Sequence, residues 1–119
     1  MGALILRQAT LAGARGSVYD AVSGKSETLA GQLRTQRAPT RRDAERRAAG
    51  SDIVIVCVPM DKNLGVFRWL FSKAAKDSEV VWVETGSVKN AIAGKLNRIL
   101  PRNHGLACVH LLTSNVAQE

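Results

Sequence analysis

A hydroxyl and a cation follow one of the chain's apolar runs directly, within the segment Gly86–Lys89 (GSVK). Glycine lets a ligand approach the backbone closely. The Ser87 hydroxyl and the Lys89 ammonium would suit an anionic substrate or a nicotinamide ring. The structural alternatives are a helix N-cap for Ser87 and a surface position for Lys89. The spacing predicts a substrate-binding position for Lys89 and a positioning or N-cap role for Ser87.

His110 stands at the end of a short apolar run and is the candidate general base. Imidazole titrates near neutral pH, so it can accept a proton from a hydroxyl while a hydride leaves the same carbon. A buried imidazole with satisfied hydrogen bonds is the alternative. His104 precedes a glycine, and we expect it to be solvated. Because no cluster of cysteines or carboxylates accompanies the two histidines, the sequence predicts no metal site.

Asp20 and Gly2 suggest contact with a dinucleotide. Asp20 ends a short predicted strand, Ser17–Asp20, and a carboxylate at the end of the second strand of a dinucleotide-binding fold binds the ribose hydroxyls. It would repel a 2′-phosphate, which favours NAD over NADP. Gly2 precedes a helical segment and could be the last glycine of a pyrophosphate loop. The alternative for Asp20 is a solvated turn carboxylate, and one glycine is a small part of the fingerprint.

Helices and strands that alternate along the chain would position these residues. The runs Ile53–Val58 and Val80–Val83 are apolar without alternation, as in strands covered on both faces. Alternation of this kind predicts a Rossmann-like parallel α/β sheet with helices on both faces and right-handed crossovers. Such sheets bind ligands beyond the carboxyl ends of their strands, where Val58, Pro59 and Glu84 stand.

The boundaries of the expected elements follow from caps and breakers. We expect helices over Ala3–Ala12, Arg41–Ala49, the segment after Asp61 and the segment after Ser87, and strands over Ser17–Asp20, Asp52–Val58, Glu79–Glu84 and Gly105–Val109. Thr40 and Asp61 are the expected N-caps of the second and third helices. The polar segment Thr35–Thr40 is either a connection or a weak edge strand.

The composition fits a single globular domain over residues 1–119, with 45% hydrophobic and 23% charged residues. No apolar run approaches the ~20 residues that a membrane helix needs. Met1–Leu6 lacks the basic start of a secretory signal, so we expect a cytoplasmic protein. Cys57 and Cys108 lie in apolar runs and are expected to be buried, reduced thiols.

A net charge of +7 raises the alternative of a nucleic-acid partner. Part of the charge is local, in Arg34, Arg37, Arg41, Arg42, Arg46 and Arg47. Aromatic residues make up only 4% of the chain and none lies within this cluster, which argues against base stacking. A solvated helix face is therefore the favoured interpretation of the arginines.

The chain resembles the prephenate/arogenate dehydrogenase family of tyrosine biosynthesis in three segments. These are Asp52–Pro59 (DIVIVCVP), Val83–Lys89 (VETGSVK) and a strand that ends in His110. This resemblance implies an NAD-dependent oxidoreductase that converts prephenate to 4-hydroxyphenylpyruvate by oxidative decarboxylation, or acts on arogenate. In that family NAD takes a hydride from the ring carbon bearing the hydroxyl, and the ring carboxylate leaves as carbon dioxide.

The resemblance also implies a role for each matched position. His110 would accept the hydroxyl proton, and Ser87 would orient that histidine, the substrate and the nicotinamide. Gly2 and Asp20 would contact the pyrophosphate and the ribose. The adenosine side of the cleft would be lined by two further residues, Val58 and Pro59.

The chain departs from the family at several places. The first strand, which normally lies between those expected at Ser17–Asp20 and Asp52–Val58, is absent with most of the glycine loop. Leu111 stands where the family has proline after its histidine, and Glu84 where it has aspartate. The helical domain that supplies dimer contacts and a substrate-binding arginine is missing.

These departures lead us to expect little or no turnover from this chain alone, and they leave a homodimer undecided. Two alternatives stay open. One is a non-catalytic, Rossmann-like module that binds a nucleotide or a partner protein. The other is another NAD(P)-dependent reductase, such as a hydroxyacid or imine reductase.

Overall fold

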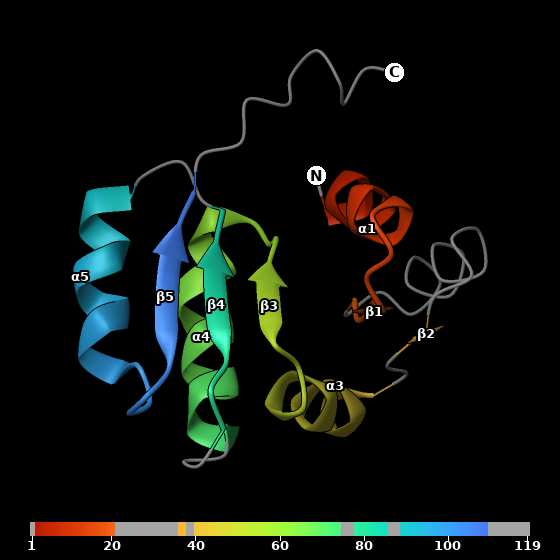
Figure 1. Ribbon diagram of the computed structural model, residues 1–119. Helices are drawn as coiled ribbons and strands as arrows, with labels where there is room; N and C mark the ends of the chain where they lie inside the picture. Colours follow the sequence, from red (N-terminus) through yellow and green to blue (C-terminus); the bar gives the residue numbers. More distant parts are fainter. Residues whose placement is uncertain (1, 21–35, 38–39, 75–77, 86–88, 110–119) are drawn as a thin grey trace. The chain divides into compact units, whose positions relative to one another are not determined.

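The computed structural model describes residues 2–20, 36–37, 40–74, 78–85 and 89–109 (Figure 1). The chain divides into two compact units, Met1–Arg47 and Ala48–Glu119. The described elements, in chain order, are α1 (Gly2–Leu11), β1 (Ser17–Val18), β2 (Gln36–Arg37), α3 (Arg41–Ala49), β3 (Ile53–Val56), α4 (Met60–Lys73), β4 (Val81–Glu84), α5 (Lys89–Ile99) and β5 (Gly105–Cys108). All the strands pair in parallel, which confirms the predicted α/β class.

In the first unit, helix α1 ends as its sequence predicts. Gly13 has a φ of 91°, a left-handed conformation that glycine adopts without steric cost. Its N–H donates to the Thr10 carbonyl and the Ala14 N–H to the Ala9 carbonyl, both at 3.0 Å. This pair of bonds satisfies the last carbonyls of the helix in the manner of a Schellman motif.

The first unit also contains a two-stranded parallel sheet. β1 pairs with β2 in the register Ser17 to Gln36 and Val18 to Arg37. This pairing confirms a strand at Ser17, shorter than expected, and the edge-strand alternative for the segment around Gln36. Asp20 follows β1 by two residues.

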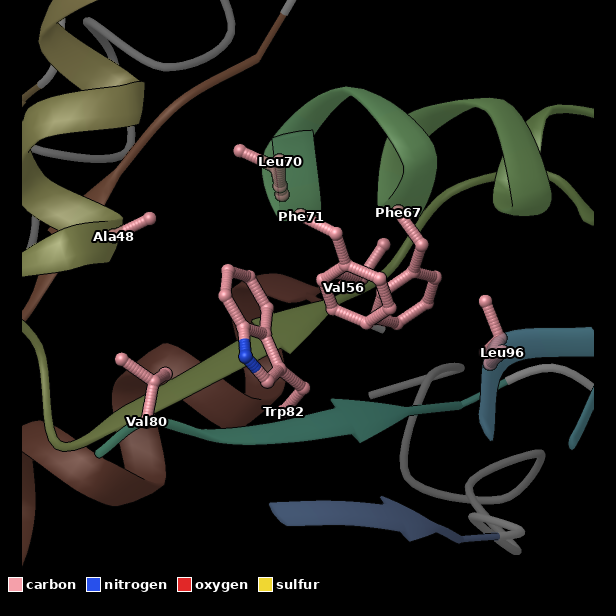
Figure 2. Close-up of a cluster of buried hydrophobic side chains, with 8 residues drawn as sticks. All are labelled: Ala48, Val56, Phe67, Leu70, Phe71, Val80, Trp82 and Leu96. Carbon is pink, nitrogen blue, oxygen red and sulfur yellow. The ribbon is translucent and has the colours of Figure 1, made fainter. Parts of the chain in front are cut away.

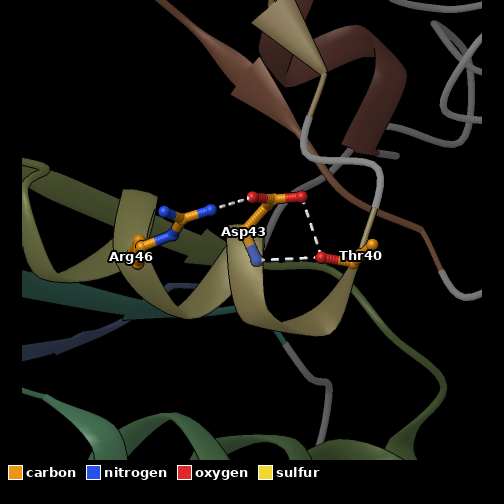
Figure 3. Close-up of polar contacts among 3 residues, drawn as sticks. All are labelled: Thr40, Asp43 and Arg46. Atoms are coloured by element: carbon orange, nitrogen blue, oxygen red, sulfur yellow. Dashed lines mark hydrogen bonds and ion pairs between the residues drawn. The ribbon is translucent and has the colours of Figure 1, made fainter.

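Helix α3 has the boundaries that its capping residues predict, Arg41–Ala49. The Asp43 N–H donates to the Thr40 hydroxyl oxygen at 3.1 Å, and that hydroxyl donates to the Asp43 carboxylate at 2.8 Å (Figure 3). The carboxylate also pairs with Arg46 one turn later. Thr40 is therefore the N-cap, as predicted.

In the second unit, three parallel strands form a sheet in the order β3-β4-β5. The register aligns Ile53 with Val81 and Gly105, and Val56 with Glu84 and Cys108. The strands are connected by α4 and α5, which contact each other, and each contacts a strand, β3 for α4 and β5 for α5. All three strands therefore end at the same edge of the sheet.

The core of the second unit lies on the side of the sheet that carries α4 and α5. Trp82 is fully buried against Phe67 and Phe71, with ring centroids 6.5 and 5.0 Å away (Figure 2). Leu96 of α5 is fully buried in the same cluster. Because strand side chains alternate, Val54, Val56, Trp82 and Glu84 share this inner face.

The opposite face of this sheet is less covered. Ile53, Ile55 and Val81 are 58%, 40% and 42% exposed. Their apolar character had predicted cover on both faces, and the described part of the chain supplies it fully on only one.

Two expectations about single residues are wrong. Helix α4 begins at Met60 with Pro59 as its N-cap, so Asp61 lies inside the first turn and does not cap the helix. His104 is buried, where we expected a solvated ring. Its Nδ1 accepts a 2.9 Å hydrogen bond from the Trp82 indole N–H, which places the imidazole proton on Nε2, 3.4 Å from the Ser78 hydroxyl.

Candidate functional site

The carboxyl edge of the β3-β4-β5 sheet is where the fold would place a ligand. The Val109 N–H donates to the Glu84 carbonyl at 2.8 Å, so β4 and β5 stay paired up to this edge. The chain therefore leaves both strands side by side, at Thr85 and at Val109. The predicted residues Ser87 and His110 follow these two points in the sequence and lie outside the described residues.

Thr85 ties the end of β4 to the end of β3. It is buried, and its hydroxyl donates to the Val56 carbonyl at 2.9 Å. The same hydroxyl lies 3.7 Å from the Cys57 sulfur. Burial raises the pKa of the Cys57 thiol, and the hydrogen bond from Thr85 offsets part of that rise. The thiol is therefore a poor nucleophile at neutral pH, and its role at this edge is packing.

Beside Thr85, the side chains of Asn63 and Glu84 form a buried polar pair. The Asn63 amide donates to the Glu84 carboxylate at 2.7 Å, and both residues are almost fully buried. The pair joins the first turn of α4 to the end of β4. The Asn63 carbonyl oxygen is also buried, and no described residue donates a hydrogen bond to it. A buried polar pair therefore lies directly beneath the carboxyl edge, between α4 and the end of β4.

Sequence reasoning placed Glu84 at a strand end where a ligand could bind and noted it as a departure from a family pattern, but it missed Asn63. A signal was present, because Asn63 lies four residues before Phe67 and seven before Leu70. Those spacings put it on the apolar stripe of α4. A polar residue on such a stripe must find a buried hydrogen-bond partner, and a carboxylate at the end of a buried strand can supply one.

The other predicted site residues divide between the two units. Val58 is half-buried and Pro59 is exposed, and both follow β3 at the carboxyl edge. Lys89 is the first residue of α5, which leaves the same edge after β4. Gly2 is the first residue of α1, and Asp20 is half-buried after β1, both in the first unit. In the second unit, Val58, Pro59 and the backbone of Lys89 therefore lie at the same edge of the sheet.

His104 lies away from this site. It precedes β5, whose first N–H, that of Gly105, donates to the Val80 carbonyl at the amino edge of the sheet. The hydrogen bond from Trp82 gives His104 a structural role there.

No protein-family model matches the chain, and no curated protein matches it. Within the described residues, no group of three or more histidine, cysteine or acidic side chains is arranged to hold a metal ion. None of the described helices is both long and apolar enough to cross a bilayer.

Proposed function

We propose that this chain is the dinucleotide-binding part of an NAD-dependent oxidoreductase similar to the prephenate and arogenate dehydrogenases. Strand order is the observation that carries the proposal. The doubly wound order is 3-2-1-4-5-6 in that fold's own strand numbers. Removing its strand 1 leaves the pairings 3-2 and 4-5-6. These correspond to β2-β1 and β3-β4-β5 in this chain. All the pairs are parallel, as that order requires.

The donor and acceptor groups of the first unit fit the two polar parts of NAD. Helix α1 has no acidic residue in its first turn, so its N-terminal N–H groups and dipole suit a pyrophosphate. The Asp20 carboxylate, just beyond the end of β1, suits the ribose hydroxyls. Cys57 and Cys108 are not joined by a disulfide, which fits a reducing compartment, and we propose a cytoplasmic location.

At the carboxyl edge of the second unit, the chain's own residues would bind and orient the substrate. Bound NAD would supply the hydride acceptor. His110 would take the hydroxyl proton, with Ser87 orienting its ring. Lys89, at the start of α5, would pair with a substrate carboxylate.

Calorimetric titration of the purified chain with NAD and with NADP tests the proposal. We expect NAD to bind and NADP to bind about tenfold more weakly, because the Asp20 carboxylate repels a 2′-phosphate. Asp20→Asn should weaken NAD binding and remove most of the preference. Asp52→Asn, at an exposed carboxylate before β3, is the matched control and should change neither. Absence of heat with either dinucleotide would contradict the proposal and favour a partner-binding module.

The reaction is tested separately by following NADH production from prephenate and from arogenate. We expect little or no production from this chain alone, and rates typical of whole enzymes would refute that expectation. Any production that His110→Ala abolishes, with NAD binding unchanged, would support the family assignment. Oxidation of other hydroxyacids that survives His110→Ala would indicate a different NAD-dependent reductase.

A further inference from the structure

The basic charge of the chain is concentrated in the first unit, Met1–Arg47. This unit contains nine basic residues against four acidic ones, so it carries +5 of the net charge of +7. Eight of the nine are arginines, whereas the second unit has more lysines than arginines. A guanidinium is always charged and binds a phosphate through two parallel hydrogen bonds. The first unit therefore has the charge and the side-chain type that suit an anionic partner.

Helix α3 gathers half of these arginines within nine residues. Its buried residues, Ala44 and Ala48, are one turn apart on one side of the helix. Arg42 and Arg46 are also one turn apart, on the opposite side. All four arginines of the helix are exposed, namely Arg41, Arg42, Arg46 and Arg47. Because burying an unpaired charge is costly, the chemistry of these side chains keeps this face in water.

Two carboxylates lie among the arginines and cancel only part of their charge. Asp43 accepts a hydrogen bond from the Thr40 hydroxyl and pairs with Arg46, and Glu45 is half-buried. An ion pair at an exposed position contributes little to stability. A phosphate could therefore replace Asp43 as the partner of Arg46 at low cost.

The composition of α3 distinguishes among anionic partners. Its sequence, RRDAERRAA, has no apolar side chain larger than that of alanine. Protein interfaces have an apolar core, and helices that bind membrane surfaces carry large apolar side chains on one face, so neither partner fits. Interfaces with nucleic acids are more polar and much more positively charged. Because the helix has no aromatic ring on which single-stranded bases could stack, the phosphates of a duplex are the best match.

We propose that α3 binds the phosphate backbone of double-stranded DNA, without reading its sequence. The major groove of B-DNA admits an α-helix, whereas that of double-stranded RNA is too narrow. DNA carries one charge per about 1.7 Å of its axis, and the first and last arginines of the helix are about 9 Å apart along α3. Each of the four arginines can therefore contact a separate phosphate. This interaction goes beyond dinucleotide binding and does not depend on it.

Fluorescence anisotropy of a labelled DNA duplex of about 20 base pairs, titrated with the full chain, tests the proposal. Four phosphate contacts predict that a plot of log binding constant against log salt concentration has a slope of about −3.6. Affinity should therefore fall by roughly 150-fold when salt rises fourfold from about 50 mM. Two duplexes of unrelated sequence should bind equally.

Paired substitutions locate the binding face. Arg42→Gln with Arg46→Gln should bring the slope to about −1.8 and weaken binding at low salt by at least about tenfold. Glutamine is a good helix former, so amide exchange should show that α3 persists. The matched control, Arg68→Gln with Arg98→Gln, removes two exposed charges from the second unit and should leave the slope unchanged. Asp43→Asn, which releases Arg46 from its ion pair, should strengthen binding.

Four results would overturn the proposal. The first is no binding of the duplex at about 50 mM salt. The second is an equal loss of affinity in both double variants, which would assign binding to net charge alone. The third is competition by polyglutamate as effective as that by unlabelled duplex, which would assign the face to an acidic protein. The fourth is tighter binding of single-stranded DNA or of an RNA duplex.

Discussion

At the scale of single residues, the carboxyl edge of the second unit is held by side chains that do not themselves react. Thr85 joins the ends of β3 and β4, and Asn63 joins α4 to Glu84. These contacts fix where β4 ends. A ligand bound beyond the strand ends would meet a preformed surface, which lowers the cost of ordering the site on binding.

The Asn63–Glu84 hydrogen bond should contribute measurably to stability because both partners are buried. Asn63→Ala removes the donor, and we expect the free energy of unfolding in urea to fall by about 2 kcal/mol. Glu84→Gln keeps an acceptor oxygen and should cost less. The double variant should cost less than the sum of the two single ones. Strict additivity would show that the two side chains are not coupled.

The Cys57 thiol gives a pH-dependent signature. Burial raises the pKa of this thiol above the ordinary value for cysteine, so folding favours the protonated thiol. Its contribution to stability is complete below the unfolded-state pKa and is lost as the pH rises through the folded-state value. In a Cys108→Ser variant, iodoacetamide should alkylate the folded chain more slowly than the urea-unfolded chain. Equal rates in the two states at pH 8 would refute this shift.

At the scale of elements, the sequence predicted best where local chemistry decides. The boundaries of α3 follow from the Thr40 hydroxyl at one end and Gly50 beyond the other, and the end of α1 follows from Gly13. Strand ends were less accurate, since a strand extends only as far as its neighbour pairs with it. The apolar run around β3 continues to Val58, but pairing stops at Val56, opposite Glu84.

The N-cap of α3 can be tested by Thr40→Ala. The hydroxyl satisfies the Asp43 N–H, so its loss should destabilise the helix by about 1 kcal/mol, while Thr40→Ser should retain most of the stability. Hydrogen bonds from Thr40 and Arg46 lower the pKa of the Asp43 carboxyl from its ordinary value. This contribution is present above the unfolded-state pKa and is lost as the pH falls through the folded-state value. Amide exchange in α3 measures both effects, and equal rates for Thr40→Ala and Thr40→Ser would contradict the capping role.

At the scale of the molecule, alternation of strand and helix predicted the parallel α/β architecture, but it could not predict which faces are covered. The runs at β3 and β4 are apolar at every position from Ile53 to Val56 and from Val80 to Val83. The cover on each face depends on elements elsewhere. Only the structure distinguishes Trp82, fully buried, from Val81, 42% exposed.

The exposed side chains of Ile53 and Ile55 and the net charge of +7 act against each other when chains meet. Like charges keep chains apart at low salt, and screening shortens their range from about 10 Å at 0.1 M salt to about 3 Å at 1 M. We therefore expect salt to promote aggregation through exposed Ile53 and Ile55, measured by light scattering. Ile55→Lys should raise the salt concentration needed more than Ile99→Lys, which adds the same charge on α5. If both lysines protect equally, net charge alone governs aggregation and Ile55 has no specific part in it.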